Sequence, residues 1–157
     1  MMLVLCGTQK QEFVRMIRAI EELANEYEII VQAGHSKYQS NKMKIFDFIT
    51  SEELTKLYDQ ADYIVTHGGA GSMFQAVKAG KKTLVFPRLA KYGEHVDDHQ
   101  LQLASKFAEL GYLQVFNDGD DIKTSITKLQ AFVPKRYDLN GEISILVAKK
   151  LNDFLAI

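Results

Sequence analysis

A glycine-rich turn at residues 67–72, with the sequence His-Gly-Gly-Ala-Gly-Ser, is the part of this chain whose residue types point most directly to a ligand. It follows an apolar, strand-like run at 63–66 and precedes a helix-like run at 73–79. A strand that leads through such a turn into a helix directs unpaired backbone N–H groups and the positive end of the helix dipole towards one point. Glycines keep that point free of Cβ atoms, and the Ser72 hydroxyl adds a hydrogen-bond donor. The pattern predicts a phosphate site, in preference to a turn that only lets a helix pack closely on a sheet.

The turn matches neither of the two common phosphate loops. A P-loop ends in Gly-Lys-Ser/Thr, and the nearest sequence, Gly-Lys-Lys-Thr at 80–83, follows the helix instead of preceding it. A dinucleotide fingerprint would need a third glycine at the position of Phe74, and it belongs to the first strand of its fold. The chemistry of the ligand must therefore come from the rest of the chain.

Length and composition are those of one globular domain. The chain has 157 residues, of which 46% are hydrophobic and 25% charged, and this size predicts a single domain spanning 1–157. A net charge of −1 gives no reason to expect nucleic acid as a partner. We find no membrane-spanning run and no signal-type N-terminus. The single cysteine, Cys6, lies in an apolar strand, which predicts a buried, unreactive thiol and a cytoplasmic protein.

Apolar runs alternate with helical patterns along the chain. The predicted strands are 3–6, 29–31, 44–49, 63–66, 83–86 and 112–116. The predicted helices are 13–26, one capped by Thr50 or Ser51, 73–79, 98–110 and two more separated by Pro134 and the Asn140-Gly141 turn. Continuous apolar strands alternating with helices predict an α/β, Rossmann-like parallel sheet of about six strands with helices on both faces.

The last predicted helix, at about 141–156, carries one apolar stripe. Its residues are Ile143, Val147, Leu151, Phe154 and Leu155. The stripe suits either an interface with a partner or ordinary packing against the sheet of this domain.

Polar residues gather where the predicted strands end. Such ends occur at 7–9, 32–34, 48–50, 67–72 and 87–100. Ligands of parallel sheets bind beyond the carboxyl ends of the strands, so these segments are expected to form one site.

Three of the four histidines, His67, His95 and His99, lie at these ends. His95 and His99 are one helical turn apart, as zinc ligands would be, but the glutamate of a His-Glu-x-x-His motif is absent. Asp97 and Asp98 are also suited to the N-terminus of a helix. Residues 118–120, with the sequence Asp-Gly-Asp, are better explained by a turn before a helix than by a metal motif. We therefore predict no metal ion and no cofactor.

An ordered set of these motifs resembles the C-terminal, donor-binding domain of GT-B glycosyltransferases. The motifs are residues 7–9, 47–49, 61–72, 80–82 with Pro87, and His99-Gln100 with Ala104. The resemblance covers nearly the whole chain. It is closest to the lipid-linked N-acetylglucosaminyltransferases of peptidoglycan synthesis and to the small donor subunits of two-component enzymes, which include the dolichol-linked enzyme and bacterial exopolysaccharide and capsule enzymes.

The resemblance implies a role for each motif. The turn at 67–72 would hold the diphosphate of a UDP-sugar, backbone groups near Phe48 and Ile49 would bind uracil, and His99 and Gln100 would face the sugar. Gln9 would lie near the diphosphate or the reaction centre. Related enzymes usually carry a ribose-binding glutamate where this chain has Gln75, whose amide can still bond a diol but without the assistance of charge.

Strand-end position and the resemblance together define the predicted substrate-binding set. It comprises Gly7, Thr8, Gln9, Phe48, Ile49, His67, Gly68, Gly69, Ala70, Gly71, Ser72, Gln75, Glu94, His95, Asp98, His99 and Gln100. The catalytic base would be His95 or a residue of a partner.

A complete GT-B enzyme also has an N-terminal acceptor domain, and this chain begins directly at the donor half. We therefore expect a membrane-anchored partner that brings the lipid-linked saccharide acceptor to the inner face of the membrane. The first hypothesis is the donor-binding catalytic subunit of a two-component glycosyltransferase, inverting and metal-independent as the resemblance implies. The second is a non-catalytic module that binds a nucleotide sugar.

Overall fold

Six parallel strands form one sheet in the computed structural model, in the order β3-β2-β1-β4-β5-β6. The structure describes residues 1–138, 140–141, 144–146 and 148–149. The strands are β1 (Met2–Leu5), β2 (Ile29–Gln32), β3 (Lys44–Phe46), β4 (Tyr63–His67), β5 (Lys82–Phe86) and β6 (Gln114–Val115). The helices are α1 (Val14–Glu21), α2 (Ser51–Gln60), α3 (Ala70–Lys78), α4 (His99–Glu109) and α5 (Ile122–Ala131), with a short 3-10 helix, η1, at Ala90–Tyr92. The predicted fold class is confirmed.

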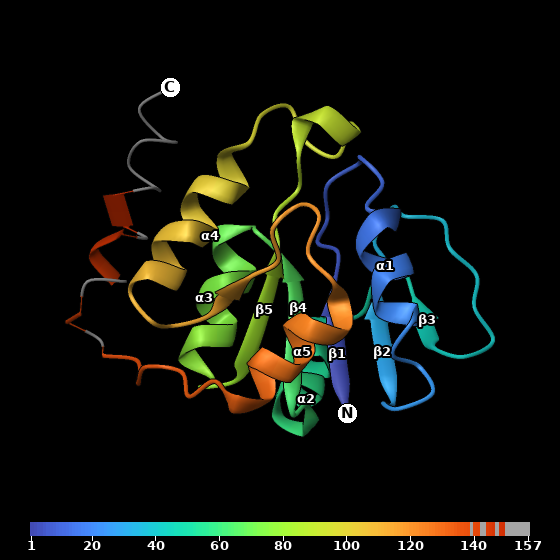
Figure 1. Ribbon diagram of the computed structural model, residues 1–157, viewed down its shortest axis with the longest axis horizontal. Coiled ribbons are helices and arrows are strands. Elements are labelled where there is room, and N and C mark those ends of the chain that lie inside the picture. The colour runs from blue at the N-terminus through green and yellow to red at the C-terminus, as the bar shows by residue number, and fades with distance from the viewer. Residues whose placement is uncertain (139, 142–143, 147, 150–157) are drawn as a thin grey trace.

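The helices cover both faces of the sheet (Figure 1). On one face, α1 and α5 pack on the strands through side chains such as Met16, Ile17 and Ile126. On the other face, α2, α3 and α4 contribute residues such as Tyr58 and Phe107. Strand β1 lies in the middle, where Leu3 is paired with Ile30 of β2 and Ile64 of β4. Because both faces are covered, β1, β2, β4 and β5 are buried on both sides, and their apolar residues follow one another instead of alternating with exposed ones.

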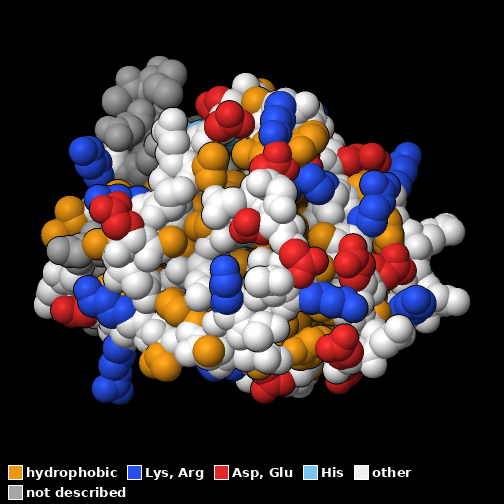
Figure 2. All heavy atoms as spheres, viewed as in Figure 1, with side chains coloured by type: hydrophobic (Ala, Val, Ile, Leu, Met, Phe, Trp, Pro, Cys, Tyr) orange, Lys and Arg blue, Asp and Glu red, His pale blue; other side chains and the backbone are white. Residues whose placement is uncertain are grey.

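The outer surface over α1 and α5 carries mixed charge. Lysine and arginine side chains alternate there with aspartate and glutamate (Figure 2). This face therefore has no basic stripe of the kind that follows a nucleic-acid backbone.

Element boundaries differ from the prediction at two places that matter for the site. Strand β3 ends at Phe46, three residues before the predicted end, because the chain leaves the sheet once the N–H groups of Ala33 and Gly34 have bonded to the carbonyls of Phe46 and Asp47. Helix α3 begins at Ala70, three residues earlier than predicted. The second half of the glycine-rich turn therefore forms the first turn of the helix.

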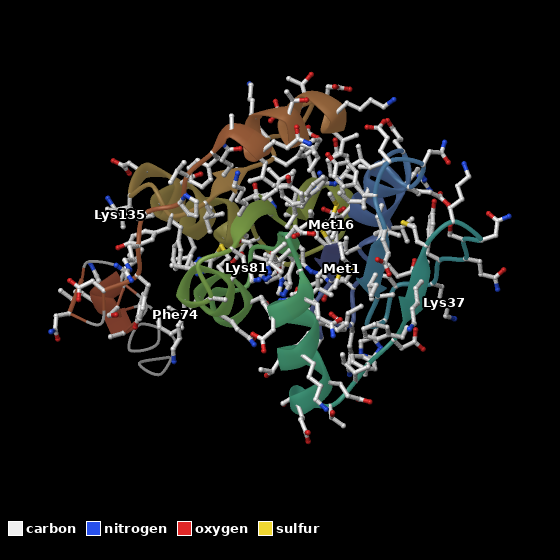
Figure 3. The ribbon with its side chains drawn as sticks, turned by 90° about the horizontal axis from the view of Figure 1, so that it is seen from below. Met1, Met16, Lys37, Phe74, Lys81 and Lys135 are labelled. Carbon is white, nitrogen blue, oxygen red and sulfur yellow. The ribbon has the colours of Figure 1, made fainter. Side chains whose placement is uncertain are left out.

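The C-terminal part of the chain returns to α3. The ring of Tyr137 lies edge-on to that of Phe74, 5.5 Å away. Phe74 lies on the side of α3 that faces the C-terminal part of the chain (Figure 3). Residues 144–146 and 148–149 are helical, inside the predicted helix at 141–156. The five residues of its predicted apolar stripe lie outside the described residues. Among the residues that are described, no helix is long and apolar enough to cross a membrane.

The predicted cap of α2 is confirmed. Thr50 Oγ1 accepts a hydrogen bond from the N–H of Glu53 at 3.2 Å, and the Glu53 carboxylate accepts one from the N–H of Thr50 at 3.0 Å. This capping box satisfies two N–H groups that would otherwise lack partners, and it fixes where the loop after β3 enters the helix.

Replacing the cap, Thr50→Ala, should lower the free energy of unfolding by about 1 kcal/mol, because the Glu53 N–H loses its acceptor. Chemical denaturation measures the change. The matched control is Ser51→Ala, one residue into the helix, where alanine suits the helix and stability should hardly change. Equal losses in both variants would show that the cap contributes nothing.

Candidate functional site

The point where the order of the strands reverses lies between β1 and β4. From β1 the chain builds outward to β2 and β3 on one side, then returns to add β4, β5 and β6 on the other. Open α/β sheets bind ligands at this switch point, beyond the carboxyl ends of the strands. The loop that follows β1 at Gly7 and the turn that follows β4 at His67 meet there, since a Cβ on Gly7 would lie 2.5 Å from His67 Nε2.

The turn after β4 presents free backbone donors. Gly69 is the N-cap of α3, with φ −70° and ψ 136°, and its carbonyl accepts the N–H of Met73 at 3.0 Å. Within the part of the chain that the structure describes, no acceptor bonds the N–H groups of Ala70, Gly71 or Ser72. These three donors and the positive end of the helix dipole form an arrangement that binds anions.

The three glycines of the turn differ in what a side chain at each position would meet. A Cβ on Gly69 would lie 2.2 Å from the His67 ring, and a Cβ on Gly68 would lie 2.7 Å from Gln100 Cβ. At these two positions, glycine makes room for a neighbouring side chain and not for a ligand, which corrects the interpretation from sequence. A Cβ on Gly71 would meet no atom within 4 Å, so the free space in front of the turn lies at this residue.

His67 lies beneath the turn as a neutral side chain. It is 7% exposed, its Nδ1 accepts the N–H of Gly69 at 3.1 Å, and its Nε2 lies 3.2 Å from Ser72 Oγ. Burial, together with the nearby positive charge of Arg88 and the presence of His95, lowers the pKa of His67 from 6.5 to about 3. His67 therefore contributes hydrogen bonds to the turn and no positive charge.

Glu94 and Gln100 hold loops in place. Each is 4% exposed. The Gln100 Oε1 accepts the N–H of Gly68 at 2.9 Å and that of Arg88 at 3.1 Å. The Glu94 carboxylate pairs with Arg15, with Nε 3.0 Å from Oε2 and Nη2 3.0 Å from Oε1. These contacts account for their burial without a ligand, and their predicted contact with a substrate stays a prediction.

Arg88 is a central residue of the site that sequence reasoning did not select. It is 1% exposed, and its guanidinium donates to the carbonyls of Cys6 at 2.7 Å, Gln11 at 2.8 Å and Glu94 at 3.0 Å. It lies over the ring of Phe13, 4.8 Å from the centroid. Arg88 thereby joins the loop after β1 to the loop after β5. The available signal was a single basic residue placed directly after Pro87 at the end of an apolar strand.

The loop between β5 and α4 is ordered by carboxylates. Asp98 Oδ1 accepts the N–H of Ala90 at 2.9 Å, and Asp97 Oδ1 accepts the N–H of His99 at 3.0 Å. The predicted role of these acidic residues at a helix N-terminus is confirmed for Asp97. His95 Nδ1 lies 3.2 Å from Asp97 Oδ1, and the side chain is 15% exposed. The assignment of His95 as catalytic base stays a prediction.

Phe48 borders a pocket at the ends of β2 and β3. The pocket has a volume of about 620 Å³ and is lined by residues 34–39 together with Asp47 and Phe48. The Phe48 ring is 50% exposed and lies edge-on to His35, 5.3 Å away. Gln32 joins the pocket to the switch point. Its Nε2 donates to the carbonyl of Gly7, in the loop after β1, at 3.1 Å and to that of Asp47, which lines the pocket, at 2.9 Å.

The other predicted site residues have no contact that assigns a role. Gln9 Oε1 is buried without a hydrogen-bond partner, Thr8 is exposed, and Ile49 and Gln75 are half-buried. A second pocket of about 690 Å³, between α4, β6 and α5, contains none of the predicted residues. The described residues include no group of three or more His, Cys, Asp or Glu side chains that could hold a metal ion. Burial raises the pKa of the Cys6 thiol to about 12, in keeping with the prediction of an unreactive cysteine.

Comparison with known proteins assigns the chain to a family. Residues 1–151 match the glycosyltransferase family 28 C-terminal domain. The chain belongs to this family. The predicted resemblance to the C-terminal domain of glycosyltransferases is therefore confirmed.

Two kinds of curated relative are similar to this family 28 domain. It is 31% identical, over 68% of its own length and 30% of the relative, to the UDP-N-acetylglucosamine–N-acetylmuramyl-(pentapeptide) pyrophosphoryl-undecaprenol N-acetylglucosamine transferase of Clostridium botulinum. It is also 31% identical, over 47% of its own length and 35% of the relative, to the UDP-N-acetylglucosamine transferase subunit ALG13 of Saccharomyces cerevisiae. The chain thus spans about a third of the length of these relatives.

Solved structures share the fold. The solution structure of ALG13 superimposes with a TM-score of 0.60 at 19% identity, and the match covers 91% of each chain. The crystal structure of MurG from Acinetobacter baumannii superimposes with a TM-score of 0.54 at 20% identity, covering 81% of this chain and 40% of that one.

The buried His67 should make stability depend on pH. Its pKa is about 3 in the folded protein against an ordinary value of 6.5, so below pH 6.5 the unfolded chain binds a proton that the folded protein does not. The contribution of neutral His67 to the free energy of unfolding is complete above pH 6.5. It is lost as the pH falls towards 3, by at most about 1.4 kcal/mol per pH unit.

Denaturant titrations at pH 7.5, 6.0 and 5.0 measure this slope. His67→Gln should flatten it, whereas His35→Gln, at an exposed histidine, should leave it unchanged. An undiminished slope in the His67 variant would show that the dependence arises elsewhere.

Proposed function

We propose that this chain is the donor-binding catalytic part of a glycosyltransferase. It transfers a sugar from a UDP-sugar to a lipid-linked saccharide in polysaccharide biosynthesis. The names of both kinds of relative specify UDP-N-acetylglucosamine transfer, so N-acetylglucosamine is the sugar that we propose first. The observation that carries the proposal is the set of three unbonded N–H groups at the N-terminus of α3, placed at the switch point of the sheet.

Along the carboxyl edge of the sheet, the site offers suitable groups for the nucleobase, the ribose, the diphosphate and the sugar of a nucleotide sugar, in that order. The pocket beside Phe48 has a flat aromatic wall for a nucleobase. Gln75 on α3 has an amide for the ribose hydroxyls, and the N–H groups of residues 70–72 face the position of the diphosphate. The sugar then lies towards the loop between β5 and α4, where His95 and His99 are half-buried.

The chemistry follows from this placement. An acceptor hydroxyl attacks C1 of the sugar, the bond from C1 to the β-phosphate oxygen breaks, and UDP leaves while a base takes the hydroxyl proton. The turn and the helix dipole stabilise the negative charge that develops on the departing UDP. His95, with Asp97 beside its ring, is the candidate base on this chain.

In this proposal, a separate protein binds the acceptor. We propose a membrane-anchored partner that binds the lipid-linked acceptor at the cytoplasmic face of the membrane. Support comes from ALG13, which is named as a subunit and matches this fold over 91% of both chains. If the complex of this chain with its partner turns over UDP-N-acetylglucosamine, the chain is the catalytic part of the enzyme. Binding of the nucleotide sugar without turnover would favour a non-catalytic module.

Nucleotide preference tests the site directly. UDP should raise the melting temperature more than ADP or GDP at equal concentration, because only ligands that bind the folded protein stabilise it by mass action. Differential scanning fluorimetry with the three nucleotides measures the shifts. Equal shifts, or none, would contradict a uridine nucleotide site.

Placing a side chain in front of the turn should abolish binding. Gly71→Val should leave the protein folded, because a Cβ there meets no atom within 4 Å, yet weaken UDP binding at least a hundredfold by filling the position of the phosphate. Isothermal titration calorimetry measures the affinity. The control, Ala79→Val, adds bulk at the exposed C-terminal end of the same helix and should bind normally. Unchanged affinity in the Gly71 variant would show that the turn is structural only.

A further inference from the structure

We propose that His67 is a positioning residue that acts through Ser72. The neutral imidazole donates to the Ser72 hydroxyl and thereby leaves the hydroxyl proton free to bond an anion at the N-terminus of α3. This inference rests on the proposed function, since the anion is the diphosphate of the nucleotide sugar.

The first step is the orientation of the Gln100 amide. One end of this amide lies 2.9 Å from the backbone nitrogen of Gly68 and 3.1 Å from that of Arg88. Both nitrogens carry hydrogen, so the amide atom that faces them must be the oxygen. The NH2 group of Gln100 therefore points to His67 Nδ1, 3.3 Å away.

The second step is the tautomer of His67. Two donors, the Gln100 NH2 group and the N–H of Gly69 at 3.1 Å, are directed at Nδ1, which must then be the nitrogen without hydrogen. The ring is neutral because it is buried in a site that also contains the Arg88 guanidinium. A neutral ring carries its single hydrogen on the other nitrogen, Nε2, which lies 3.2 Å from Ser72 Oγ.

The third step is the direction of the Ser72 proton. Since Ser72 Oγ accepts from His67, its own hydrogen must point to another acceptor. A serine in a helix often donates to the carbonyl four residues earlier, but no such bond is present at Ser72 in the described chain. The unbonded N–H groups of Ala70, Gly71 and Ser72 lie in the same helical turn, so the Ser72 hydroxyl adds a fourth donor to these three.

Direct contact between His67 and an anion is disfavoured by the packing around the ring. The ring is close to Gly7 and Gly69, at which a Cβ would come within 2.5 and 2.2 Å of it. With 7% of the residue exposed, the imidazole has no open face for a ligand. Its effect on binding must therefore pass through the groups that it orients.

Nitrogen-15 NMR of the free wild-type protein tests the tautomer without any ligand. We expect His67 to remain neutral with the hydrogen on Nε2 from pH 5 to 8. An imidazolium ring, or a hydrogen on Nδ1, would overturn the inference whether or not the protein binds a nucleotide.

A double-mutant cycle with UDP-N-acetylglucosamine tests the coupling, and calorimetry measures the affinity. Ser72→Ala and His67→Leu should each weaken binding about tenfold or more, the effect of losing a hydrogen bond to a charged group. In the Ser72→Ala background, His67→Leu should cost less than about threefold. His67→Gln, whose amide can still donate to Ser72, should bind within about threefold of wild type. Ser105→Ala, at an exposed serine of α4, is the control and should bind normally.

The possible outcomes separate the two claims. Additive losses for His67 and Ser72, or binding that tightens as the pH falls through 6.5 in the wild type but not in His67→Gln, would mean that His67 contacts the anion itself. Either result would overturn the inference while leaving the function intact. Failure of the wild-type protein to bind UDP-N-acetylglucosamine would overturn the proposed function instead.

Discussion

The buried polar network around Gln100 and Arg88 determines where the loops at the carboxyl edge of the sheet lie. The Gln100 amide bonds the backbone of Gly68 after β4 and of Arg88 after β5, and the Arg88 guanidinium continues to the carbonyls of Cys6 and Gln11 around β1. Groups that are buried in this way need their partners, since removal of one leaves the others unsatisfied at a cost of about 1–3 kcal/mol each. The network therefore holds three loops in a fixed relation, and the N-terminus of α3 faces the switch point as a result.

The fold was predictable because its signals are local. Apolar runs of strand length alternating with helical patterns indicate a covered parallel sheet, and Thr50 followed by Glu53 marks a helix start in the sequence itself. The misplaced boundaries have physical causes. The apolar pattern continues past Phe46 although the ladder stops there, and Gly71, a poor helix former, concealed that α3 begins at Ala70.

The site was only partly predictable, because its contacts join residues that are far apart in the chain. The strand-end rule selected loops that the structure brings together at one edge of the sheet, and the composition of the glycine-rich turn marked the N-terminus of α3. Burial of Glu94 by Arg15 links positions 79 residues apart, and the bond from Arg88 to Cys6 links positions 82 apart. No local sequence pattern indicates such pairs, so the structural contacts of Glu94 and Gln100 were not predicted and Arg88 was not selected.

The central claim is that the free N–H groups at the start of α3 bind the diphosphate of a nucleotide sugar. The most direct measurement is a titration of the nitrogen-15-labelled protein with UDP-N-acetylglucosamine, followed through the backbone amide signals. The account predicts saturable shifts that are largest at Ala70, Gly71 and Ser72, with smaller ones around Phe48 and none along α5. Shifts confined to the second pocket, between α4, β6 and α5, or no saturable shifts at all, would contradict this account.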